Sequence, residues 1–128
     1  TLKKPFLVNI GNPHIIFFDD EIEKYDVESF GSLIENDDLF PEKINVSFAK
    51  LKSDNHIVLN VWERGAGKTS ACGTAACATA VAGVEMGVIK NKVTVTLPGG
   101  DLEIYYKSTD NIIMTGPTEI NFTDNYKL

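Results

Sequence analysis

One alanine-rich segment limits what this chain can fold into. From Thr74 to Val88 the sequence is rich in alanine and carries few charges. Alanine is the strongest helix former, so this composition predicts a helix. A helix with small side chains on nearly every side offers no polar face to solvent. We therefore predict a slim helix enclosed by a sheet built from the rest of the chain.

The flanking segments have the patterns of β-strands. Apolar and polar residues alternate in 44–51 and in 57–62, as expected of strands. Both faces of 57–62 are mostly apolar, so we predict that this strand is central. Alternation on both sides of a Pro-Gly-Gly-Asp turn predicts a hairpin over 92–106. Further strands are predicted at 5–10 and 15–18, separated by a turn at 11–14, and at 111–117.

A second helix is predicted to follow Asp26, which has the side chain of an N-cap. Val27, Phe30, Leu33 and Ile34 would share its buried face. The order of strands, helix, strands, helix, hairpin and strand predicts an α+β fold. We expect a mainly antiparallel β roll or barrel wrapped around a central helix, within a single domain spanning residues 1–128.

Composition excludes several classes of protein. The 128 residues carry a formal net charge of −6, whereas a nucleic-acid binder needs a basic patch. No apolar run reaches the roughly 18 residues of a membrane span, and we expect no signal peptide, because TLKK leads directly into the first predicted strand. We therefore expect a cytoplasmic protein that binds neither membrane nor nucleic acid. The start at Thr1 suggests a piece of a longer protein or a processed product.

The chain has two cysteines, Cys72 and Cys77. Their spacing places them on well-separated faces of a helix, so a disulfide between them is geometrically poor. The two histidines, His14 and His56, show no metal-ligand spacing, and we predict no metal site. So low a cysteine count is typical of a reducing compartment.

Cys72 lies just before the alanine-rich helix. The backbone N–H groups of Gly73, Thr74 and Ala75 would be among the unpaired donors at the helix start. Such donors favour a thiolate, so we predict a Cys72 pKa below that of a free thiol. The same donors can bind a carboxylate or a phosphate. Glycines at 65, 67 and 73 would allow a ligand to approach the backbone closely.

Less specific interpretations of this segment are also open. A glycine-rich turn before a helix is often only structural, and a buried cysteine such as Cys77 is usually a small apolar residue of the core. Gly-Lys-Thr at 67–69 resembles part of a phosphate-binding loop. That motif needs a glycine at position 62, which is Trp62, and a helix directly after the threonine. The residues therefore disfavour nucleotide binding.

The segment ERGAGKTSACGTAACA, from Glu63 to Ala78, closely resembles the C-terminal cysteine motif of the diaminopimelate epimerase family. GNPH, FPEKINVSF, VTLPGGDLEI and MTGP resemble other motifs of that family's second half, in the same order. The resemblance covers nearly the whole chain. It implies cofactor-independent epimerisation of LL-2,6-diaminopimelate to meso-diaminopimelate, for lysine and peptidoglycan synthesis. It also implies two catalytic cysteines, one from each of two similar domains.

The resemblance assigns roles to individual residues of this chain. Cys72 would be the catalytic acid/base of the second domain, with His14 and Glu63 tuning its pKa. Gly73 and Thr74 would bind the α-carboxylate of the substrate through backbone N–H groups. Glu63 and Arg64 would bind the distal ammonium and carboxylate. Since adjacent strand residues point to opposite faces, both can reach one ligand only if the chain turns at Arg64, which Gly65 would permit. The remaining substrate contacts would come from Asn12 and Asn45.

Two features depart from the family pattern. Ala75 stands where the family usually has glycine. Its methyl group could crowd the substrate or be absorbed without harm, and we expect the second. The first-domain cysteine is not in this chain, and Cys77 cannot reach the opposite face of a substrate from the same helix. We therefore expect that the chain alone is inactive. We also expect that its tail at 117–128 packs on the missing N-terminal domain and that the protein could form a homodimer.

Two other functions remain open at this point. The chain could be a non-catalytic half that binds an amino acid or a partner protein through its exposed inter-domain face. It could also belong to another amino-acid racemase with the same fold. Solvent deuterium incorporation into competing amino acids would separate these alternatives.

Overall fold

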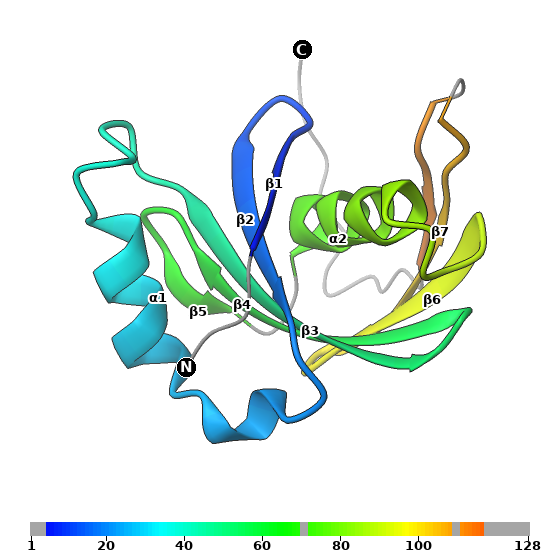
Figure 1. Cartoon of the computed structure of the whole chain (residues 1–128), viewed down its shortest axis with the longest axis horizontal. Coiled ribbons are helices and arrows are strands. Elements are labelled where there is room, and N and C mark those ends of the chain that lie inside the picture. Colours follow the sequence, from blue (N-terminus) through cyan, green and yellow to red (C-terminus); the bar gives the residue numbers. More distant parts are fainter. Residues whose placement is uncertain (1–4, 70–71, 109–110, 117–128) are drawn as a thin grey trace, which may run out of the picture.

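A computed structural model describes residues 5–69, 72–108 and 111–116. In this part of the chain, an eight-stranded sheet curls around helix α2, Gly73–Glu85, while helix α1, Val27–Glu35, lies outside the curl (Figure 1). The strands run in the order β1-β2-β3-β4-β6-β7-β8, with β5 paired to β4. Their bounds are β1 Phe6–Asn9, β2 Pro13–Phe18, β3 Asn45–Ser53, β4 His56–Glu63, β5 Gly67–Thr69, β6 Lys92–Leu97, β7 Gly100–Tyr105 and β8 Ile113–Thr115.

The connections explain the strand directions. β2 pairs with β3, and β4 with β6, in parallel, and the chain between the members of each pair contains α1 or α2. Parallel neighbours need such crossovers. The other pairings are antiparallel. The sheet is therefore mixed and curled into a half-barrel, and the predicted α+β roll around a central helix is confirmed.

Alternation in the central strands divides the core between the two faces of the sheet. Ala49 of β3 and Leu59 of β4 belong to the cluster around α2, while Val46 and Phe48 belong to the cluster that α1 covers. The predicted alternation and the central place of β4 are confirmed. Ser47, on the side of β3 that the sequence marks as polar, is nevertheless fully buried, because helices cover both faces.

Helix α2 is enclosed as predicted, and its alanines are buried. It ends at Glu85, three residues before the predicted end at Val88. Gly87, with φ of 73°, donates to the Val84 carbonyl, and Val88 donates to that of Gly83. This pair of bonds is a Schellman motif, which ends a helix at a glycine of positive φ.

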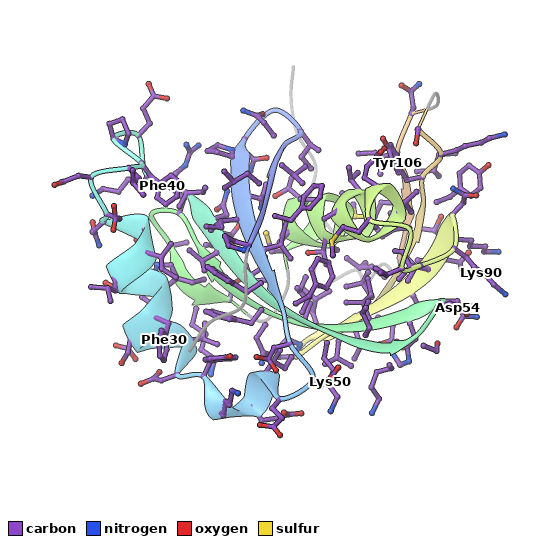
Figure 2. All side chains as sticks on the ribbon, in the orientation of Figure 1. Phe30, Phe40, Lys50, Asp54, Lys90 and Tyr106 are labelled. Carbon is purple, nitrogen blue, oxygen red and sulfur yellow. The ribbon has the colours of Figure 1, made fainter. Side chains whose placement is uncertain are left out.

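The far end of α2 is fixed to the sheet, at the opposite end from Cys72. The Tyr106 hydroxyl, just after β7, donates to Glu85 at 2.8 Å, and Figure 2 shows Tyr106 beside the helix. Lys90 also forms an ion pair with Asp54, 3.6 Å apart, in the turn between β3 and β4 (Figure 2). These contacts hold the loop after α2 against the sheet.

Helix α1 begins as predicted, with the Asp26 carboxylate accepting from the backbone of Glu28 and Ser29. Its predicted buried face is partly wrong, because Leu33 is 73% exposed. Gly31 is buried instead and packs directly on Trp62; a Cβ on Gly31 would lie 2.4 Å from the Trp62 Cβ. This close contact through a residue without a side chain turns the buried face away from Leu33.

The hairpin of β6 and β7 is confirmed, with Leu97 paired to Gly100 across a two-residue turn. The predicted last strand is also present, shortened to Ile113–Thr115. A 3₁₀ turn at Ile22–Lys24 was not predicted. The tail at 117–128 lies outside the described residues. Over the described ranges, no helix has the length and apolar character needed to cross a membrane.

Candidate active site

Cys72 is the N-cap residue of α2 and is 5% exposed. Its thiol donates to the Glu63 carboxylate across 3.5 Å and lies 3.6 Å from the Thr74 hydroxyl. The helix start, the end of β4 and the thiol thus meet at one point. Gly-Lys-Thr at 67–69 forms β5, not the start of a helix, which agrees with the rejection of a phosphate-binding loop.

A chain of hydrogen bonds extends from this thiol to the β1–β2 turn. The Asn12 amide donates to the Thr74 hydroxyl at 3.4 Å, and its oxygen lies 3.2 Å from His14 Nε2. Glu63, Cys72, Thr74, Asn12 and His14 are therefore linked in sequence. The structure brings these predicted site residues together, although they come from separate parts of the chain.

Asn45 is buried and bonded to backbone groups of two other segments, and its predicted contact with a substrate stays a prediction. It is only 3% exposed; its amide donates to the Pro13 carbonyl at 3.0 Å, and its oxygen accepts from the Arg64 backbone N–H at 2.7 Å. These bonds connect β2 to the turn after β4. In this structure, Asn45 holds backbone in place, and its oxygen already has a partner.

Glu63 and Arg64 are neighbours that must diverge to reach one ligand. β4 ends at Glu63, a turn follows over 64–66, and Gly65 adopts a φ of 76°. The predicted turn at Arg64, permitted by Gly65, is confirmed. The Arg64 side chain is exposed and donates to the Glu42 carbonyl at 3.4 Å.

The predicted low pKa of Cys72 is wrong for this structure. Burial raises the pKa of the Cys72 thiol above its ordinary value, and the Glu63 carboxylate adds to that rise. The Thr74 hydroxyl and the Ala75 backbone N–H favour the thiolate but do not outweigh burial. The prediction counted the donors at the helix start and omitted the loss of solvent around the sulfur.

His14 is 1% exposed, and burial together with the positive charge of Arg64 lowers its pKa to about 4. The ring is therefore neutral at pH 7. Its Nδ1 is buried and has no hydrogen-bond partner among the described residues. His14 also lines a mostly apolar cavity of about 310 Å³ with Leu7, Phe40 and Ile44.

Several residues of the site escaped sequence reasoning. Met114 of β8 packs on the helix start, with its sulfur 3.0 Å from where a Gly73 Cβ would lie. Glu35 and Trp62 support the turn after β4 from behind. The sequence shows that Met114 lies in the MTGP motif and that Glu35 lies near the end of the helix after Asp26. Neither position predicts a contact with a distant segment.

Ala75 and Cys77 lie in the first turns of α2. The Ala75 side chain is fully buried in the core cluster, and the effect of its methyl group on substrate binding stays a prediction. Cys77 is half-buried and packs against the same cluster. Both cysteines are free. Within the described ranges, no group of three or more His, Cys, Asp or Glu side chains could hold a metal ion.

The fold and the site together define a curled mixed sheet around a helix that starts at a buried cysteine, and the thiol of that cysteine donates to a carboxylate. Comparisons with known proteins identify the family. Residues 6–121 match the family model for diaminopimelate epimerase. The chain belongs to the diaminopimelate epimerase family.

Individual relatives agree with this assignment. The chain is 50% identical over 125 residues to a diaminopimelate epimerase from Erythrobacter litoralis. The aligned residues cover 98% of this chain and 46% of the relative. It is 48% identical over 122 residues to one from Methylocella silvestris, covering 94% of this chain and 42% of the relative. The chain thus spans less than half the length of these relatives.

Solved structures share the fold. A phenazine biosynthesis protein of the PhzF family from Bacillus anthracis superposes with a TM-score of 0.58 at 21% identity, over 87% of this chain and 35% of that one. A PhzF family protein from Enterococcus faecalis superposes with a TM-score of 0.57 at 18% identity, over 77% of this chain and 35% of that one. At such identities the similarity concerns the fold alone.

Proposed function

We propose that this chain supplies one of two acid/base cysteines for the cofactor-independent epimerisation of LL-2,6-diaminopimelate to meso-diaminopimelate. The observation that carries the proposal is the position of Cys72 at the start of α2, with its thiol on Glu63 and Thr74. The names of the relatives supply the substrate class. The second cysteine would come from a first domain comparable in length to this one.

The helix start suits the α-carboxylate of an amino acid. Removing an α-proton builds negative charge that must be offset in the transition state. Backbone N–H groups at the start of a helix bind anions, and Gly73 and Thr74 provide them here. With the carboxylate at that point, the substrate α-carbon would lie near the Cys72 sulfur. Arg64, beyond Glu63, has the bidentate guanidinium that suits the distal carboxylate.

The protonation of Cys72 favours one half of the reaction. Its raised pKa and its hydrogen bond to Glu63 keep the sulfur protonated. A thiol can deliver a proton to one face of the α-carbon while the other cysteine, as thiolate, removes the original proton from the opposite face. In the reverse direction, a thiolate at Cys72 would be favoured by the Thr74 hydroxyl and the Ala75 N–H.

Solvent deuterium exchange tests the substrate. The protein to be tested is this chain together with its proposed first domain, called the two-domain protein below. It should be incubated in D₂O with diaminopimelate, proline and hydroxyproline in parallel, and deuterium at each α-carbon measured by mass spectrometry. We expect incorporation only into diaminopimelate. Incorporation into proline or hydroxyproline instead would assign the chain to a different racemase, and no incorporation into any amino acid would favour a binding role.

A further inference from the structure

Glu35 is an unusual residue for its place in helix α1. It is the last residue of the helix and is buried. A negative charge at a helix C-terminus is disfavoured by the helix dipole, and buried carboxylates are rare unless they are paired. Its position therefore calls for partners outside the helix.

The partners lie on both sides of the Glu63–Arg64 pair. One Glu35 oxygen accepts from the Trp62 indole N–H at 3.0 Å, and the other accepts from the Gly65 backbone N–H at 3.0 Å. A single carboxylate thus bridges the end of β4 and the turn that follows it. Hydrogen bonds to a charged acceptor are about twice as strong as neutral ones.

The turn after β4 is fixed from several directions. Its successive backbone N–H groups go to three acceptors: Arg64 donates to Asn45 Oδ1, Gly65 to Glu35, and Ala66 to the Glu63 carbonyl. Two of these acceptors are buried side chains from β3 and α1. The two buried acceptors, Asn45 and Glu35, therefore hold the backbone of the turn from β3 and from α1.

Trp62, which donates to Glu35 from the end of β4, is itself held in place by packing. Its ring packs on Gly31, where a Cβ would come within 2.4 Å of the tryptophan side chain. A Cβ on Gly67 of β5 would lie 3.5 Å from the edge of the same ring. The indole is thus held between α1 and β5, with its N–H aimed at Glu35.

We propose that Glu35 is a positioning residue that fixes the turn after β4, and thereby holds Glu63 at the Cys72 thiol and Arg64 at the distal carboxylate of the substrate. The part concerning Arg64 rests on the proposed function, whereas the part concerning Glu63 rests on the contacts alone. The Trp62 N–H is the main cause that lowers the pKa of the Glu35 carboxyl group, and the Gly65 N–H and the charges of Lys43 and Arg64 lower it further, against burial, which raises it.

A double-mutant cycle tests whether Glu35 acts through Glu63. The pH dependence of Cys72 alkylation by iodoacetamide would be measured in a Cys77→Ala background for the parent, Glu35→Gln, Glu63→Gln and the double variant. Glu35→Gln should lower the Cys72 pKa by about 0.5 unit, which triples the thiolate fraction at neutral pH, because the Glu63 carboxylate is no longer held at the sulfur. Glu63→Gln should lower it at least as much, and adding Glu35→Gln should then change nothing.

The exposed Glu28, in the same helix, provides the matched control, and Glu28→Gln should leave the Cys72 pKa unchanged. Two results would overturn the proposal. In one, Glu35→Gln behaves like Glu28→Gln. In the other, the shift caused by Glu35→Gln persists in the Glu63→Gln background, which would mean a general loosening around the thiol.

A measurement on the unmodified chain covers the case in which Glu35→Gln does not fold. Trp62 is the single tryptophan, so its indole N–H gives one ¹⁵N–¹H resonance. This resonance and the Gly65 amide should shift together on acidification, with one midpoint below the usual glutamate range. Independent midpoints, or no shift, would contradict the assignment. Neither experiment requires turnover, so a failure to exchange the α-proton of diaminopimelate would refute the proposed function separately.

Discussion

At the scale of single residues, Cys72 shows that a helix start alone does not decide the state of a thiol. The donors of α2 favour the thiolate, but burial and the Glu63 carboxylate favour the thiol and prevail. A ligand that displaced Glu63 from the sulfur, or a partner domain that changed its solvation, would alter this balance.

Cys72 should accordingly titrate above the ordinary range of a free cysteine in this chain. The rate of alkylation of Cys72 as a function of pH, followed by peptide mass spectrometry, gives the midpoint. Burial of the sulfur is the main cause. A midpoint below about 8.5, the value of an unperturbed thiol, would show instead that the donors of the helix start dominate.

His14 should make stability depend on pH. Its pKa is about 4 in the folded chain against 6.5 for the unfolded residue, so between these values the unfolded state binds more protons. The stability due to the neutral ring is present above pH 6.5 and is lost as the pH falls towards 4. The difference approaches about 3 kcal/mol. Urea unfolding at pH 7 and at pH 4.5 measures how much of the free energy of unfolding is lost on acidification. This loss should be smaller for His14→Gln than for the parent, and equal losses would contradict the role of His14.

At the scale of elements, the contact of α1 with Trp62 depends on Gly31. Gly31→Ala should destabilise the chain by about 1–3 kcal/mol through overpacking, despite the better helix propensity of alanine. Leu33→Ala, on the exposed side, should change stability by less than about 0.5 kcal/mol. Urea denaturation compares the two variants. If Leu33→Ala destabilised the chain more than Gly31→Ala, the result would contradict this packing and support the buried face that the sequence predicts.

At the scale of the whole molecule, the fold was predictable from two sequence patterns, the alanine-rich segment and the alternating segments. An alanine-rich helix without a polar face needs enclosure, and two-residue alternation in 44–51 and 57–62 supplied the enclosing strands. Errors arose where the outcome depended on distant contacts. Leu33 is exposed because Gly31 docks on Trp62. The hydrogen bonds of Asn45 to Pro13 and Arg64 were also not predictable from the sequence, while its predicted contact with a substrate stays a prediction.

The gathering of the site residues was predictable only through the family resemblance. Nothing in the spacing of Asn12, Glu63 and Cys72 places them together. The fold does so: hydrogen bonds join the β1–β2 turn to the start of α2 and the start of α2 to the end of β4. Glu35 escaped prediction because its role depends on a tertiary contact between α1 and β4.

The share of its relatives that this chain spans leads to a further prediction. The chain spans less than half the length of its relatives, and a two-base mechanism needs a second sulfur on the opposite face of the substrate. The 128-residue chain alone should show no epimerisation of diaminopimelate above the uncatalysed background, measured by chiral chromatography. Turnover by the purified chain would contradict the two-cysteine account.

The central claim is that Cys72 transfers the proton, and one comparison tests it most directly. The rate of solvent deuterium incorporation at the α-carbon of diaminopimelate should be measured for the two-domain protein and for its Cys72→Ser and Cys77→Ser variants. We predict that Cys72→Ser lowers the rate by at least about 100-fold, as expected for loss of a general acid or base, while Cys77→Ser leaves it nearly unchanged. Retention of the full rate by Cys72→Ser would contradict the account.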